Sequence, residues 1–113
     1  MSISKELVAA SATPIVLSIL ARGESYGYAI IKQVRNVSDG QMQWTDGMLY
    51  PVLHRLESQR LVRSRWRTSE TGRKRKYYRL TKKGIAALQR SQGQWKLVNS
   101  TLAKLWKDAP CLT

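Results

Sequence analysis

The chain has few of the residues that build disulfide frameworks, metal sites and catalytic centres. Its 113 residues include one cysteine, Cys111, one histidine, His54, and seven acidic residues scattered along the chain. A single cysteine excludes an intrachain disulfide framework and fits a reducing cytoplasm. No set of side chains converges on a catalytic or metal-binding pattern. We therefore expect no enzyme activity, no metal and no cofactor.

Long hydrophobic segments are missing as well. The longest apolar run, residues 15–21, is interrupted by Ser18 and is far shorter than the roughly 20 apolar residues that span a bilayer. The beginning of the sequence lacks the charged and then apolar pattern of a signal peptide. We expect a cytoplasmic protein without a membrane-inserted segment.

Positive charge is what the sequence has in excess. Twenty Lys and Arg residues against seven acids give a formal charge of +13. This charge favours a polyanionic partner, so nucleic acid is the first candidate and an anionic membrane surface is a weaker one. The excess is local, because Glu70 is the only acid between Arg63 and Lys83. Four consecutive cations, residues 73–76, follow the turn-forming residues 68–72 and can reach phosphates.

The apolar periodicity and the turn residues predict four helices and one hairpin. We expect helices over residues 4–21, from Ser25 to about Val37, from Asp46 to about Arg60 and from Lys82 to about Lys107, with two antiparallel strands between Leu61 and Leu80. Thr13-Pro14 predicts a break or kink in the first helix, and Ser25, Thr45 and Thr81 are the expected caps of the others. The fold class is mostly α (α+β), a winged helix-turn-helix with a two-stranded β-wing and a long C-terminal dimerisation helix.

The third helix combines a buried stripe with an outward face suited to DNA. Leu49, Val52, Leu53 and Leu56 recur at helical spacing as the expected buried stripe, and polar or aromatic residues occupy the opposite side. In a winged helix-turn-helix, this helix enters the major groove and the basic wing reaches phosphates. The residues that we expect to contact DNA are Thr45, Met48, Tyr50, Pro51, His54, Arg55, Arg73, Lys74, Arg75 and Lys76.

The last helix is too long, at about 39 Å, for so small a core to cover. Its apolar residues repeat every seven positions, with others three residues later, which is the a/d pattern of a helix seam. The predicted dimer interface consists of Leu88, Trp95, Val98, Leu102 and Leu105, and the first helix shares it. An amphipathic helix packed on its own domain is the alternative. Residues 1–81 would form the winged helix-turn-helix, and residues 82–113 would add the dimerisation helix and tail to the same domain.

Three motifs in order resemble the PadR-type transcriptional regulators over about residues 13–85. Tyr26-Gly27-Tyr28 resembles the start of the family's second helix, and residues 47–51 followed by Arg55-Leu56-Glu57 resemble its recognition helix. Residues 72–81 are similar to its wing. The resemblance implies a dimeric repressor with Tyr50 and its outward neighbours at the DNA.

The single C-terminal helix resembles the short branch of this family that includes multidrug-sensing regulators. In that branch a Trp from each subunit lines a central pore, and Trp95 matches its position. The resemblance implies a planar aromatic effector at the dimer interface, with Ser18, Trp95, Asn99 and Leu102 as candidate contacts. Where that branch has an acid four residues after the Trp, this chain has Asn99, which argues against a cationic effector. Plain interface packing is the alternative role of Trp95.

Together these patterns predict a homodimeric, sequence-specific regulator of transcription. It would bind double-stranded DNA at a near-palindromic operator, act as a repressor and be released by the effector. The alternative is a basic RNA-binding or nucleoid-type module without operator or effector. Competition by unrelated nucleic acid separates the two, because an operator protein prefers its site by roughly a thousandfold or more.

Overall fold

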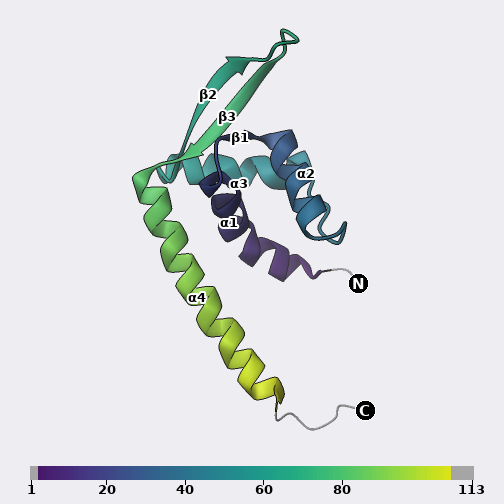
Figure 1. Cartoon of the computed structure of the whole chain (residues 1–113), viewed down its shortest axis with the longest axis vertical. Helices are drawn as coiled ribbons and strands as arrows, with labels where there is room; N and C mark the ends of the chain where they lie inside the picture. The colour runs from purple at the N-terminus through teal and green to yellow at the C-terminus, as the bar shows by residue number, and fades with distance from the viewer. Residues whose placement is uncertain (1–2, 108–113) are drawn as a thin grey trace.

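The computed structural model describes residues 3–107, and Cys111 lies outside the described residues with the rest of the tail. The elements are α1 (Lys5–Ala21), β1 (Ser25–Tyr26), α2 (Gly27–Val37), α3 (Asp46–Ser58), β2 (Val62–Thr68), β3 (Lys74–Leu80) and α4 (Lys82–Lys107). In Figure 1, α1, α2 and α3 lie together, the β2–β3 hairpin rises from them, and α4 extends in the opposite direction. The predicted winged helix-turn-helix with a long C-terminal helix is confirmed.

Helix α1 is continuous from Lys5 to Ala21 with Pro14 inside it, so of the two predicted alternatives at residues 13–14 the break is wrong, and the kink stays a prediction. A proline in a helix removes one backbone hydrogen bond and crowds the preceding turn, at about 3 kcal/mol. Val16 and Leu17 lie within the next turn of the helix and are fully buried, and burying each such side chain contributes about 1.5–3 kcal/mol. Packing therefore holds the helix together through the proline.

Residues 25–26 form a short strand, which the sequence pattern did not predict. Ser25 pairs with Tyr78 and Tyr26 pairs with Tyr77, so the sheet has three antiparallel strands in the order β1-β3-β2. Helix α2 starts after this strand, at Gly27, and no side chain caps it. The expected cap at Ser25 is wrong because its backbone pairs with β3, which satisfies polar groups in another way.

Helix α3 has defined ends. Thr45 caps it as expected, and its hydroxyl oxygen accepts a hydrogen bond from the Met48 backbone at 3.3 Å. At the other end Arg60 adopts a φ of +63°, and the Leu61 amide donates to the Leu56 carbonyl at 2.9 Å. These are the features of a Schellman motif. The chain is thereby turned from the end of α3 directly into β2.

The core lies where α1, α2, α3 and the base of the hairpin meet. Its largest fully buried side chains are Val16, Leu17, Ile30, Leu49, Leu53, Leu56 and Val62. The three leucines of α3 lie on one face of that helix, as the sequence predicts. Because this inner face is fixed in the core, the outer face of α3 remains free.

Helix α4 belongs to the core only near its beginning. The Thr81 hydroxyl accepts a hydrogen bond from the Gly84 amide at 3.0 Å and donates one to the Arg60 carbonyl at 2.7 Å. Leu88 is only 7% exposed and packs in the core. Later apolar residues of α4 are exposed, namely Leu97, Val98, Leu105 and Trp106. Across residues 3–107, every helix is too short or too polar to span a membrane.

Two glycines of α4 provide a matched test of how closely this helix approaches the hairpin. A Cβ on Gly84 would overlap the Leu61 carbonyl oxygen, whereas a Cβ on Gly93 would meet nothing within 4 Å. We expect Gly84→Ala to lower the free energy of unfolding by about 1–3 kcal/mol through overpacking. Gly93→Ala should raise it by about 1 kcal/mol through helix propensity. Urea unfolding measures both, and equal effects of the two variants would contradict the described packing.

Candidate nucleic-acid interface

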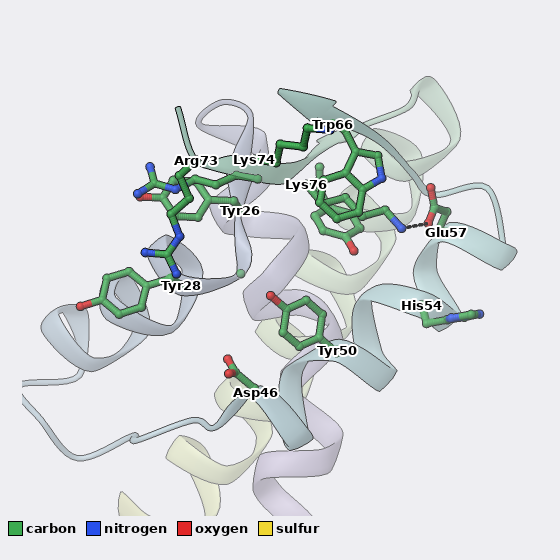
Figure 2. Close-up of a pocket in the computed structure, with 13 residues that line it drawn as sticks. Tyr26, Tyr28, Asp46, Tyr50, His54, Glu57, Trp66, Arg73, Lys74 and Lys76 are labelled. Carbon is green, nitrogen blue, oxygen red and sulfur yellow. Dashed lines mark ion pairs between the residues drawn. The ribbon is translucent and has the colours of Figure 1, made fainter. Parts of the chain in front are cut away.

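A groove of about 930 Å³ lies between α3 and the β2–β3 hairpin. Figure 2 shows Tyr50 pointing from α3 into this groove, with wing residues across from it. Asp46 and His54 also line it from α3. The other lining residues come from β1, α2, the end of α3 and the hairpin, and they are Tyr26, Gly27, Tyr28, Glu57, Trp66, Arg73, Lys74, Arg75, Lys76 and Tyr78.

The beginning of α2 sets the position of Tyr50. A Cβ on Gly27 would lie 2.5 Å from the phenolic oxygen of Tyr50 and 2.9 Å from its ring carbon Cζ. Only a glycine therefore lets the Tyr50 ring lie against the start of α2. This contact explains the glycine in the Tyr26-Gly27-Tyr28 motif, because Gly27 leaves room for the Tyr50 side chain of α3.

The tip of the hairpin is closed by a hydrogen-bonded turn. The Ser69 amide donates to the Arg73 carbonyl at 2.8 Å, and the Gly72 amide donates to the Ser69 carbonyl at 2.9 Å. Gly72 has a φ of +82°, a conformation that favours glycine. This turn delivers the four consecutive cations of residues 73–76 to the edge of the groove.

Strand pairing places an exposed tryptophan among these cations. Trp66 is paired with Lys76 across the two strands, and its side chain is 67% exposed. It lines the groove together with Lys74. Figure 2 shows Trp66 next to Lys76 on the side of the hairpin that faces α3. The wing therefore presents an aromatic surface as well as positive charge.

Tyrosines and arginines interlock on β1, β2 and β3. The Tyr26 and Tyr77 rings meet edge to face with centroids 5.2 Å apart. The Arg67 guanidinium lies 4.6 Å from the centroid of the Tyr77 ring, and that of Arg75 lies 4.5 Å from the centroid of the Tyr26 ring. Such cation–π contacts contribute about 0.5–1 kcal/mol each at exposed sites. They hold β1 and the hairpin as one unit.

Glu24 neutralises two arginines of the wing. Its carboxylate accepts hydrogen bonds from Arg65 Nε at 3.0 Å and from Arg67 Nη1 at 2.8 Å. The Arg65 hydrogen bond is the main reason that the pKa of Glu24 lies below its ordinary value of 4.5. The same contact raises the pKa of Arg65. Glu24 thus fastens β2 to the segment that precedes β1.

Glu57 joins α3 to both strands of the hairpin. Its carboxylate accepts a hydrogen bond from the Ser64 hydroxyl on β2, and Glu57 Oε1 lies 3.9 Å from Lys76 Nζ on β3. Lys76 Nζ also lies 5.8 Å from the centroid of the Tyr78 ring. The pKa of Tyr78 is raised by burial first and by the charge of Glu57 second. Polar contacts of Glu57 therefore help to fix the orientation of the wing relative to α3, in addition to the apolar core.

The arrangement favours an extended polyanion rather than catalysis. Cations line one wall of the groove and the exposed face of a helix forms the other, which is how phosphate contacts and base contacts are combined in DNA recognition. Among residues 3–107, no group of three or more His, Cys, Asp or Glu side chains is placed to hold a metal ion.

Known proteins share both the sequence pattern and the fold. Residues 16–90 match the Transcriptional regulator PadR-like family. This chain belongs to the PadR-like family. An uncharacterised protein of Lysinibacillus sphaericus is 32% identical over 72% of this chain and 74% of its own length. The transcriptional regulator YqjI of Escherichia coli is 32% identical over 78% of this chain, which spans only 41% of YqjI.

Solved structures of transcriptional regulators, among them a PadR family member, have the same architecture. A transcriptional regulator from Clostridium thermocellum is 32% identical and superposes with a TM-score of 0.81, over 90% of this chain and 96% of that one. A PadR family transcriptional regulator from Eggerthella lenta is 35% identical with a TM-score of 0.76, over 92% and 88% of the two chains. The resemblance in the three sequence motifs is thus confirmed at the level of family and fold.

Within this PadR-like fold, six of the ten residues expected to contact DNA line the groove together: Tyr50, His54, Arg73, Lys74, Arg75 and Lys76. Pro51 is exposed on α3. Thr45 caps the helix, and Met48 is half-buried against the core. Arg55 donates a hydrogen bond to the Thr13 hydroxyl on α1, so its guanidinium lies outside the groove.

The other residues that line the groove are not among the ten expected DNA contacts. They are Tyr26, Gly27, Tyr28, Asp46, Glu57, Trp66 and Tyr78. Strand alternation carries a signal for Trp66, because it shares a phase with the core residue Val62 four positions earlier. Tyr28 on α2 is 64% exposed, whereas Ile30 and Val34 of the same helix are buried. Tyr26 lies on β1, which the sequence pattern did not predict.

The Glu24 contacts give an expected pH dependence of stability. Because the folded-state pKa of Glu24 is lowered, its stabilising effect is present above its ordinary value of 4.5 and is lost as the pH falls through the lower folded value. Glu24→Gln should therefore lower the melting temperature at neutral pH, and the difference from wild type should disappear in acid. Glu70→Gln on the hairpin turn is the control. A Glu24→Gln deficit that persists unchanged in acid would contradict this assignment.

Proposed function

We propose that this PadR-like regulator is a homodimeric repressor that binds a near-palindromic operator in double-stranded DNA. The observation that carries the proposal is the groove in which the free face of α3 opposes four consecutive wing cations. Tyr50 and His54 are assigned to base edges in the major groove. Arg73, Lys74 and Arg75 are assigned to phosphates, which supply affinity independent of sequence.

The uncovered part of α4 supports the homodimer. Val98 and Leu105 are exposed at seam positions, and Trp95 and Leu102 are half-buried. A second copy of α4 would cover this surface. Leu88 already packs in the core of its own chain, so we assign the seam to the four later residues. Two-fold symmetry of the dimer then requires two inverted half-sites about one turn of DNA apart.

A second hollow supports control by a small molecule. It has a volume of about 430 Å³, lies between α1, α2 and α4, and is lined mostly by apolar groups. Two of the expected effector contacts, Ser18 and Trp95, line this hollow, whereas Asn99 and Leu102 do not. We propose that a planar aromatic effector stacks on Trp95 there, as in the multidrug-sensing branch, and lowers DNA affinity by favouring one dimer geometry.

Salt dependence and sequence preference separate the two roles in the DNA interface. Replacing Arg73 and Lys74 together by Ala should flatten the dependence of log affinity on log salt by about 0.9 for each phosphate that the wing no longer neutralises. Tyr50→Ala should instead change which sequences are selected from random DNA. An unchanged salt slope would remove the wing from the interface. If the wild type binds its selected site no better than unrelated DNA or RNA, the protein is a non-specific binder and the operator proposal fails.

Trp95 fluorescence tests the effector site. In a variant that keeps only this tryptophan, with Trp44, Trp66 and Trp106 changed to Phe, planar aromatic compounds should quench emission and weaken operator binding over the same concentration range. The matched control keeps only Trp106, which is 68% exposed on α4 outside the hollow. A broad panel of aromatic compounds that leaves Trp95 emission and operator affinity unchanged would end this part of the proposal.

A further inference from the structure

A carboxylate occupies the groove that the proposed function assigns to DNA phosphates. Glu57 lines the groove from the last turn of α3. An acid is unfavourable here for two reasons. The C-terminus of a helix carries partial negative charge, and DNA phosphates in the groove would repel a carboxylate. Asp46, the other acid of the groove, lies in the first turn of α3, where the helix dipole favours it. Glu57 therefore needs a separate reason.

Its partners supply that reason. Glu57 Oε2 accepts the Ser64 hydroxyl hydrogen bond, and Glu57 Oε1 lies 3.9 Å from Lys76 Nζ. Lys76 Nζ also lies 5.8 Å from the centroid of the Tyr78 ring. Figure 2 shows the Lys76 side chain directed to Glu57 along the groove.

The other cations of this segment are differently placed. Within residues 3–107, Arg73, Lys74 and Arg75 form no ion pair with a carboxylate. Among the described residues, Lys76 is therefore the only one of the four consecutive cations that is countered by an acid, and that acid is on the recognition helix.

We propose that Glu57 withholds Lys76 from DNA phosphates and so limits the affinity of the wing for DNA of any sequence. An exposed pair at this distance contributes little to stability, but it keeps a negative charge beside Lys76, which a phosphate would otherwise engage. Glu57 acts here as a positioning residue, through Lys76. The inference deepens the proposed function and rests on it, since the groove must be where DNA binds.

Glu57→Gln is the informative change, because the amide oxygen can still accept the Ser64 hydrogen bond while the charge is removed. We expect log affinity for a random-sequence duplex to fall more steeply with log salt, by about 0.9. Between about 50 and 200 mM salt, this steeper slope makes the loss of affinity about three to four times larger than in wild type. Sequence preference should not change, because the additional interaction is with phosphate.

Two further variants separate the release of Lys76 from two other effects of Glu57→Gln. These other effects are the loss of a negative charge from the groove and a change in the hydrogen bond to Ser64. Ser64→Ala removes the hydrogen bond and keeps both charges, so its salt slope should equal that of wild type. In a Lys76→Met background, Glu57→Gln should leave the slope unchanged. An unchanged slope for Glu57→Gln alone, or the same increase with and without Lys76, overturns the inference. Because the test uses random-sequence DNA, its result does not depend on whether the protein prefers an operator. If the wild type shows no such preference, the proposed function is refuted and not this inference.

Discussion

The packing of one face of α3 is the constraint on which the rest of the molecule depends. Leu49, Leu53 and Leu56 are all fully buried, and truncating such a leucine typically costs about 2–5 kcal/mol. Their packing fixes α3 against α1, α2 and the base of the hairpin. The opposite face of the helix is consequently presented on a rigid scaffold, as a binding surface requires.

The wing is held in place by polar and aromatic contacts rather than by a core of its own. Glu24 binds two arginines of β2, Glu57 binds Ser64 and Lys76, and Tyr26 and Tyr77 meet edge to face. The hairpin can therefore extend beyond the apolar core and still keep a defined orientation. The few acids of this basic chain serve this purpose near the wing, which leaves the cations of residues 73–75 without a carboxylate partner among the described residues.

The sequence predicts those features that depend on local pattern. Thr45 and Thr81 cap helices where expected, the hairpin turns at residues 69–73, one position after the expected residues 68–72, and α4 extends beyond the core. Features that depend on distant partners escaped prediction. Strand β1 exists because two residues meet β3 about fifty positions later, and its pairing overrides the local capping preference of Ser25. Pro14 remains inside a helix because tertiary packing outweighs its local effect.

In the candidate site, too, the residues placed by local pattern could be predicted and those placed by distant partners could not. The cations of the wing are consecutive in the sequence, so their joint position could be predicted from the hairpin alone. Arg55 could not be placed, because its hydrogen bond to Thr13 joins α3 to α1. Met48 lies on the same helix as Tyr50 but packs toward the core. The sequence pattern of α3 does not show which side Met48 faces, because polar residues occupy most of the helix surface. The tight fit of Tyr50 against Gly27 likewise depends on how α2 and α3 approach each other.

Hydroxyl-radical footprinting of the wild-type protein on a DNA site selected from random sequence tests most directly whether α3 and the wing act as one DNA-binding surface. The structure leads us to expect two protected tracts related by two-fold symmetry, about one turn of DNA apart. Each tract should extend into the neighbouring minor groove, where the wing would lie. A single asymmetric tract, or protection spread evenly along the DNA, would contradict the account.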